Sequence, residues 1–152
     1  IMDIAVIGTG YVGLVSGLCF AHLGHRVTAV DLDAEKVELL QACVPTIYES
    51  GLKEMLVEQV NAKRITFTVD LKKALSQSEI VVIAVGTPTN QHFQADLSYI
   101  NQAIDSVLAA VKHDITIVIK STVPVGTNHE LNERVKQANL PYCIDIVSNP
   151  EF

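Results

Sequence analysis

The sequence predicts an α/β fold in which helices cover both faces of a doubly wound, mostly parallel sheet of six strands. Six short runs are β-branched and almost continuously apolar, which is typical of strands buried on both faces of a parallel sheet. Amphipathic stretches separate these runs, so strand and helix alternate and right-handed crossovers are expected. Three glycines also follow the first run within six positions, where the chain passes from strand to helix.

Each expected strand is a short apolar run, and each expected helix is an amphipathic stretch. The strands are, in chain order, "DIAVIG" (3–8), "RVTAVD" (26–31), "RITFTV" (64–69), "EIVVIAVG" (79–86), "DITIVIKS" (114–121) and "YCIDIVS" (142–148). The helices are expected at 11–24, 34–42, 50–61, 70–77, 97–112 and 127–138. In the fifth helix, apolar residues recur at helical spacing and form one stripe: Leu97, Ile100, Ile104, Val107, Leu108 and Val111. Glycine, proline and asparagine make the segment 86–96 the longest expected loop.

Length and composition exclude several classes of protein. A chain of 152 residues suits one domain with one sizeable core, and 49% apolar against 18% charged residues argues against disorder. The formal charge of −6 argues against a nucleic-acid or anionic-membrane surface. No apolar run is long enough to span a membrane and no secretory leader is present, so a cytoplasmic protein is expected.

The cysteines indicate neither disulfides nor a metal site. Cys19, Cys43 and Cys143 are odd in number and far apart, with no C-x-x-C pair and no histidine at ligand spacing. We expect them to be reduced and mostly buried, as free cysteines usually are.

The glycine turn indicates a dinucleotide site. Gly8-Thr9-Gly10-Tyr11-Val12-Gly13 follows the first strand and opens a helix, the context that a G-x-G-x-x-G motif requires. The first glycine permits a tight turn, the second removes a Cβ that would meet a diphosphate, and the third lets the helix pack close to the strand. The N–H groups of the helix start favour the diphosphate, so a Rossmann-type fold is predicted.

An acidic residue ends the second strand. Asp31 lies where the dinucleotide fingerprint expects a carboxylate that accepts hydrogen bonds from the adenosine ribose. That carboxylate would repel the 2′-phosphate of NADP, so we expect NAD as the cofactor.

Hydroxyl side chains follow two further strands. "VGTPT" ends the fourth strand and "KSTVPVGT" the fifth, and ligands of open α/β sheets bind at the carboxyl ends of strands. Thr87, Ser121 and Thr122 are therefore candidates to reach a cofactor or substrate. Each loop taken alone is more often an ordinary turn, but their agreement on one edge of the sheet favours a ligand site.

Several motifs, in order along the whole chain, resemble the nucleotide-sugar dehydrogenases. They are "IAVIGTGYVGL", "VDLDAEKV", "PTIYESGL", "VGTPT", "ADLSYI", "KSTVPVGT" and the closing "SNPEF". Within this family, "IYESGL" and "ADLSYI" look most like the members that oxidise UDP-glucose. Members acting on UDP-N-acetylmannosamine or GDP-mannose are the alternative.

The resemblance implies oxidation of the primary alcohol of a nucleotide sugar to a uronic acid, in two NAD-dependent hydride transfers, for polysaccharide precursors. A cysteine holds the intermediate as a thioester. The resemblance assigns these residues to the cofactor: Gly8, Gly10, Gly13, Asp31, Lys36, Thr87 and Thr122. Tyr11 and Val12 of the glycine turn and Ser121 of the loop after the fifth strand are further candidates for cofactor binding. Lys36 joins Asp31 at the adenosine ribose. Thr122 and Glu151 are also implied in ordering or activating water.

Family members continue beyond the length of this chain. The catalytic cysteine, the catalytic lysine, a central helix that forms a homodimer and most of the UDP-sugar site follow in them, and none of the three cysteines here replaces the nucleophile. We therefore expect residues 1–152 to be the N-terminal NAD-binding part of a longer enzyme, to bind NAD without turnover, and to be monomeric alone. Ser50 and "NQHFQ" depart from the family pattern without touching the chemistry.

Two other functions are consistent with the same fold. Relatives of 6-phosphogluconate and hydroxyisobutyrate dehydrogenases share this half of the molecule, but "YESGL" and "KSTVPVGT" argue against them. A non-catalytic, NAD-sensing module would use the same glycine turn, because a fold does not determine function.

Overall fold

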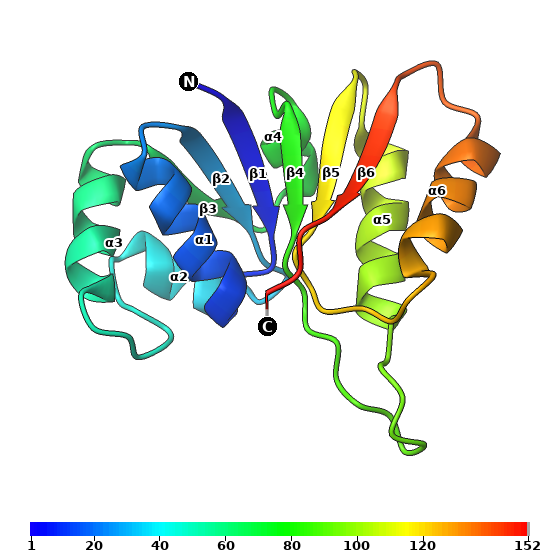
Figure 1. Ribbon diagram of the computed structural model, residues 1–152. Coiled ribbons are helices and arrows are strands. Elements are labelled where there is room, and N and C mark those ends of the chain that lie inside the picture. The colour runs from blue at the N-terminus through cyan, green and yellow to red at the C-terminus, as the bar shows by residue number, and fades with distance from the viewer. Residues whose placement is uncertain (152) are drawn as a thin grey trace.

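Six parallel strands form one sheet in the order β3-β2-β1-β4-β5-β6 in the computed structural model, which describes residues 1–151 (Figure 1). The strands are β1 (Asp3–Ile7), β2 (Arg26–Val30), β3 (Ile65–Thr68), β4 (Ile80–Ile83), β5 (Ile115–Ile119) and β6 (Ile144–Ser148). Every pairing between neighbours is parallel. The prediction of an α/β fold with a six-stranded sheet is confirmed. The sheet was predicted to be mostly parallel, and all six of these strands are parallel. The strand order reverses between β1 and β4, which creates a topological switch point.

The helices lie where the amphipathic stretches predicted them; α6 has the predicted bounds and the other five are shorter. They are α1 (Tyr11–His22), α2 (Ala34–Gln41), α3 (Leu52–Asn61), α4 (Leu71–Leu75), α5 (Ser98–Ala110) and α6 (Thr127–Ala138). Asp33 and Asp70 cap α2 and α4, because their carboxylates accept hydrogen bonds from the amides of Lys36 and Lys73. Among residues 1–151, no helix is long and apolar enough to cross a membrane.

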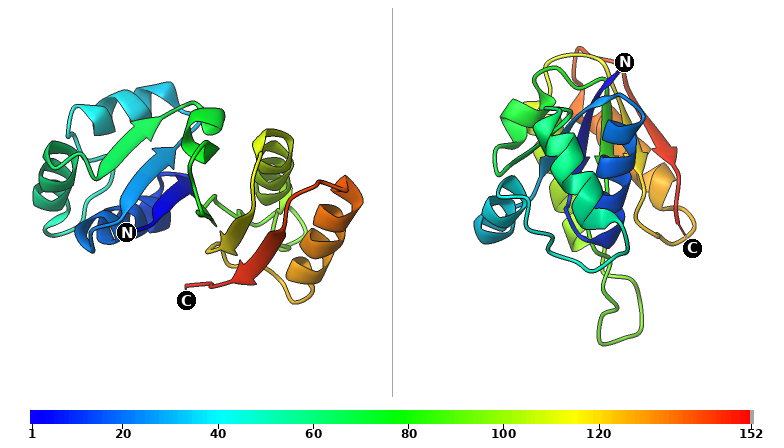
Figure 2. Two further views of the ribbon diagram at one scale, coloured as in Figure 1. Left: turned by 90° about the horizontal axis from the view of Figure 1, so that it is seen from above. Right: turned by 90° about the vertical axis from the view of Figure 1, so that its left-hand side faces the viewer.

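Two apolar cores fill the space between the sheet and its helices. Residues of α1, α2 and α3 pack on one face of the sheet, against strand residues such as Val6 and Ala29. Residues of α4, α5 and α6 pack on the other face, against residues such as Ile83 and Ile117. Two of the views show the α1–α3 group and the α5–α6 group flanking opposite halves of the sheet (Figures 1 and 2). Burial of this kind is the main stabilising contribution to the fold.

The prediction that all strands are buried on both faces is wrong for β3, β5 and β6. In β3 and β5, buried residues alternate with exposed or half-buried ones, and in β6 only Ile144 is buried. Val147 of β6 is 47% exposed and pairs with Val118 of β5 on the face away from α5 and α6. No helix of residues 1–151 covers this part of the sheet, so its apolar side chains alternate in burial.

The segment 86–96 is the predicted loop, and it projects from the body of the molecule (Figure 2, right). A single bridge between Thr89 and Ala95 narrows it. The Asn90 side chain accepts hydrogen bonds from the amides of His92 and Gln94, which shapes the tip. The loop therefore has local order despite its exposure.

The three cysteines are free thiols, but the prediction that they are mostly buried is wrong. Cys19 and Cys143 are exposed, and Cys43 is half-buried. Cys19 lies on the outer side of α1, and Cys143 lies in the turn before β6. Their positions in the sequence did not show which side of each element faces the core.

Gly13 and Gly8 make the closest backbone approach at the start of α1. A Cβ on Gly13 would overlap with the carbonyl oxygen of Gly8. Gly8 has a φ of +96°, and a Cβ there would lie 2.7 Å from the carbonyl oxygen of Ala84 in the segment after β4. These two positions need glycine for the fold itself.

We predict that Gly13→Ala lowers the free energy of unfolding by about 3 kcal/mol or more, because backbone atoms must move to admit the methyl group. Gly17→Ala is the matched control on the same helix. A Cβ on Gly17 meets only side chains, at 3.6 Å or more, and alanine favours a helix by about 1 kcal/mol over glycine. Chemical denaturation checks both, and equal stability of the two variants would contradict the packing argument.

Candidate functional site

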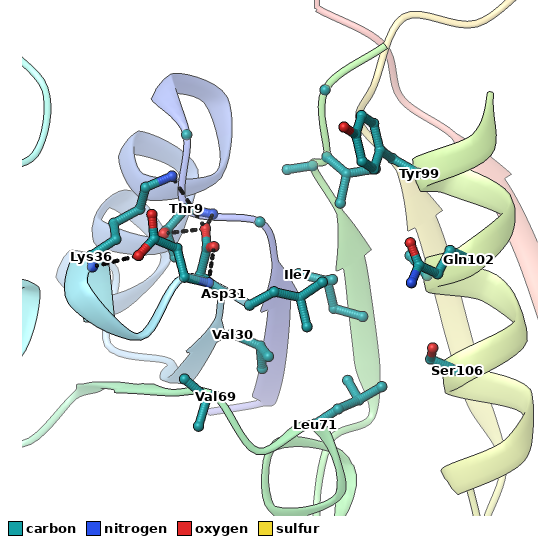
Figure 3. Close-up of a pocket in the computed structure, with 18 residues that line it drawn as sticks. Ile7, Thr9, Val30, Asp31, Lys36, Val69, Leu71, Tyr99, Gln102 and Ser106 are labelled. Atoms are coloured by element: carbon teal, nitrogen blue, oxygen red, sulfur yellow. Dashed lines mark hydrogen bonds and ion pairs between the residues drawn. The ribbon is translucent and has the colours of Figure 1, made fainter. Parts of the chain in front are cut away.

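A cleft of about 530 Å³ lies at the carboxyl ends of β1, β2 and β4 (Figure 3). One wall comes from the glycine turn and the end of β2, and the other comes from α5. Its labelled lining residues are Ile7, Thr9, Val30, Asp31, Lys36, Val69, Leu71, Tyr99, Gln102 and Ser106. The cleft therefore occupies the switch point, where ligands of open α/β sheets bind.

Gly10 lines the cleft, and no contact with residues 1–151 requires it to be glycine. A Cβ on Gly10 would have no atom within 4 Å, and its φ of −70° suits any residue. Gly8 and Gly13, by contrast, are fixed by contacts with the protein backbone. The open space beside Gly10 fits a group that approaches the backbone closely, as the diphosphate of a dinucleotide does.

The N-terminus of α1 carries no intramolecular cap. Gly10 supplies no side-chain hydrogen bond, and the first turn contains no acidic residue. Helices α2 and α4 of the same chain both have an aspartate cap. The first N–H groups of α1, which include those of Val12 and Gly13, therefore remain available to an external anion.

Asp31 is held by a network of hydrogen bonds at the end of β2 (Figure 3). Its Oδ2 accepts from the Thr9 amide at 2.9 Å and from the Thr9 hydroxyl at 2.7 Å. Its Oδ1 accepts from the Asp33 amide at 3.0 Å. The ammonium group of Lys36 lies 3.6 Å from Oδ2. Asp31 and Lys36 thus lie together in the lining of the cleft.

These partners keep the Asp31 carboxyl ionised. Burial raises the pKa of this group, but the hydrogen bonds from the Asp33 amide and from Thr9, with the positive charge of Lys36, outweigh burial. The net pKa is lower than the usual value for aspartate. A carboxylate that is ionised at neutral pH accepts hydrogen bonds from sugar hydroxyls and repels a phosphate.

The far wall of the cleft was not predicted. Tyr99, Gln102 and Ser106 of α5 lie across the cleft from Asp31 (Figure 3). The apolar side chain of Val69 lies near Val30 on the Asp31 side, and that of Leu71 lies between the two walls. The three α5 residues are spaced at helical intervals beside the apolar stripe, which was the one signal that could have found them. Val69 and Leu71 suit the flat apolar faces of a nucleobase.

The other predicted hydroxyl residues form a second group outside the cleft lining. Thr87 donates a hydrogen bond from its hydroxyl to the backbone oxygen of Thr122 at 3.2 Å. The Thr122 hydroxyl donates to the backbone oxygen of Glu151 at 3.1 Å. The Ser121 hydroxyl donates to the backbone oxygen of Val85 at 2.6 Å, and Val85 itself lines the cleft. The loops after β4 and β5 thus lie together at the cleft's edge.

Glu151 is exposed and has a cationic partner that sequence reasoning missed. The ammonium group of Lys120 lies 3.5 Å from Glu151 Oε2 and donates a hydrogen bond to Asn149 Oδ1 at 3.2 Å. Lys120 belongs to the segment "KSTVPVGT", in which the sequence analysis proposed only hydroxyl residues as candidates for the site. The last described residues are therefore fastened to the end of β5.

Tyr11 connects the glycine turn to the "PTIYESGL" segment. Its hydroxyl donates a hydrogen bond to Glu49 Oε2 at 2.6 Å. This bond and the charge of Glu49 raise the pKa of the Tyr11 hydroxyl, and the charge of Glu151 adds to the shift. Tyr11 and Val12 are not among the residues that line the cleft.

Comparison with known proteins identifies the family. The sequence model of the UDP-glucose/GDP-mannose dehydrogenase family, NAD binding domain, matches residues 2–152. The chain belongs to this family. Membership of this family argues against the 6-phosphogluconate and hydroxyisobutyrate dehydrogenase alternative. The family model describes an NAD-binding domain, so the cofactor of the domain is NAD.

Individual members of the UDP-glucose/GDP-mannose dehydrogenase family match along almost the whole chain. The UDP-glucose 6-dehydrogenase TuaD of Bacillus subtilis is 46% identical over 150 residues, which are 98% of this chain and 32% of that protein. A UDP-glucose dehydrogenase structure from Pyrobaculum islandicum has a TM-score of 0.93 at 38% identity, covering 100% of this chain and 36% of that one. A GDP-mannose dehydrogenase ternary complex from Pseudomonas aeruginosa has a TM-score of 0.93 at 31% identity, covering 99% and 36%. The chain thus spans about a third of the length of these relatives.

Proposed function

We propose that this chain binds NAD in the cleft at the switch point and is the N-terminal, cofactor-binding part of a UDP-glucose 6-dehydrogenase. The observation that carries the binding proposal is the open space beside Gly10, next to an uncapped helix N-terminus. Asp31 and Lys36, at one end of the same cleft, are suited to hydrogen-bond the hydroxyl groups of a ribose. When bound, the nicotinamide of NAD accepts hydride from the substrate.

The residues divide into groups with different tasks in this proposal. The N–H groups at the start of α1 receive the diphosphate, and Asp31 with Lys36 receives the adenosine ribose. Val69 and Leu71 contact the adenine, and the α5 side chains close the cleft opposite them. Thr87 and Ser121 fix the loops after β4 and β5 at the edge where the nicotinamide half belongs.

Thr122 and Glu151 are the proposed catalytic contribution of this chain. Thr122 holds the backbone at Glu151, and Lys120 holds the Glu151 side chain, so both groups are positioned at the carboxyl edge of the sheet. There they would orient the water that hydrolyses the thioester formed by the second oxidation. The thiol nucleophile and most of the UDP-sugar site belong, in this proposal, to the longer enzyme, which acts as a homodimer.

Gly10→Ala is predicted to weaken NAD binding by about tenfold or more without loss of stability. The methyl group fits the protein, since no atom lies within 4 Å, but it occupies the space proposed for the diphosphate. Calorimetric titration with NAD measures the affinity, and thermal unfolding confirms the fold.

Gly86→Ala is the matched control, because a Cβ on Gly86 also has open space among the described residues, and Gly86 lines the cleft from the segment after β4. It is expected to affect NAD affinity less than Gly10→Ala. Unchanged NAD affinity in a folded Gly10→Ala variant would rule out a diphosphate at this turn.

The substrate is tested in the full-length protein that contains this chain. UDP-glucose is expected to give NADH, followed by absorbance, at a higher kcat/KM than UDP-N-acetylmannosamine or GDP-mannose. The "IYESGL" and "ADLSYI" motifs and the names of the relatives support this choice. NAD binding without oxidation of any of the three sugars would instead favour an NAD-sensing module.

A further inference from the structure

Thr9 makes the most extensive contact with Asp31, and the proposed function gives it no task. It is fully buried, with 0% of its surface exposed, between the two glycines that shape the turn. Its amide and its hydroxyl both donate to the same carboxylate oxygen, Asp31 Oδ2, at 2.9 and 2.7 Å. The residue thus joins the glycine turn after β1 to the end of β2 (Figure 3).

The two bonds from Thr9 decide which oxygen of Asp31 is free. A carboxylate oxygen has two lone-pair directions, and Thr9 occupies both of those on Oδ2. The Asp33 amide occupies one direction on Oδ1 at 3.0 Å. One direction on Oδ1 therefore remains for an external donor, and the carboxylate plane is fixed by three bonds from two segments of the chain.

We propose that Thr9 is a positioning residue that sets the cofactor preference of the cleft, because its hydroxyl holds Asp31 with one oxygen presented to a ribose hydroxyl and opposed to a 2′-phosphate. This inference rests on the proposed binding of NAD. Without the Thr9 hydroxyl, one of the three bonds that fix the Asp31 carboxylate is lost. The free oxygen is then no longer held toward the ribose, and the carboxylate loses a donor that favours its charged form.

The hydroxyl is not needed to fill space, which makes the role testable. Valine has nearly the same shape as threonine, so Thr9→Val keeps the volume and the amide bond and removes one donor. Thr9→Ser keeps the donor and removes a methyl group. Asp31→Ala removes the carboxylate altogether, so it shows the largest change in the ratio of NAD to NADP affinity with which the Thr9 variants can be compared.

The charged groups that face Asp31 are few. Lys36 of α2 is the cation beside it, and the Asp33 carboxylate is turned to cap the same helix by accepting from the Lys36 amide. Burial raises the pKa of Asp31, and the Thr9 hydroxyl is one of the donors that lower it. Thr9→Val keeps the burial and loses that donor, so the pKa of Asp31 is expected to rise toward or above its ordinary value.

Calorimetry with NAD and with NADP on wild type, Thr9→Val, Thr9→Ser and Asp31→Ala is the first test. Thr9→Val is expected to bind NAD on the order of tenfold more weakly, and its affinity for NADP is expected to change less. The ratio of NAD affinity to NADP affinity should therefore fall toward the ratio measured for Asp31→Ala. Thr9→Ser is expected to retain the wild-type preference. Equal losses for both cofactors in Thr9→Val, or no loss at all, would overturn the inference.

Carbon-13 NMR of the Asp31 carboxyl, titrated without cofactor, is the second readout. The titration midpoint is expected to rise in Thr9→Val and to stay near wild type in Thr9→Ser, and an unchanged midpoint in Thr9→Val would overturn the inference. If wild type binds neither dinucleotide, the proposed function fails, and the carboxyl titration still reports whether Thr9 controls Asp31. If wild type prefers NAD and Thr9→Val keeps the same ratio of NAD to NADP affinity, only the role of Thr9 fails.

Discussion

The close approach of Gly13 to the Gly8 carbonyl group is the constraint on which the site depends. No side chain fits between them, so α1 begins directly against the turn that leaves β1. This contact aims the N-terminus of α1 at the switch point between β1 and β4, where the strand order reverses. A looser junction would displace the unsatisfied N–H groups from the cleft and separate the turn from Asp31.

Electrostatics then distinguish the two ends of the cleft. At the start of α1, no cap and no acidic residue of the first turn compete with an external anion. At the end of β2, a carboxylate is held ionised by Thr9, the Asp33 amide and Lys36. A dinucleotide has the complementary order, with a diphosphate next to a ribose, and a single ligand can satisfy both ends. The family match gives the same cofactor by independent means.

The sequence predicted the parts of the site that depend on local spacing. The glycine turn and Asp31 could be found because strand, turn and helix follow one another directly along the chain. The far wall could not, because the sequence does not show which side of α5 borders the cleft, although its apolar stripe was correctly predicted. The exposure of β6 was missed because its run was interpreted as continuously apolar, although Asp145 and Ser148 interrupt it.

An NMR titration of the 152-residue chain with NAD, followed at the backbone amides, tests the central claim most directly. The account predicts saturable shift changes at residues 8–13, at 31–36, at 69–71 and on the side of α5 that carries Gln102. These changes should be the largest in the spectrum. The absence of changes at high NAD concentration would contradict the account. So would changes centred on the second cavity, lined by Lys72, Lys112 and His113.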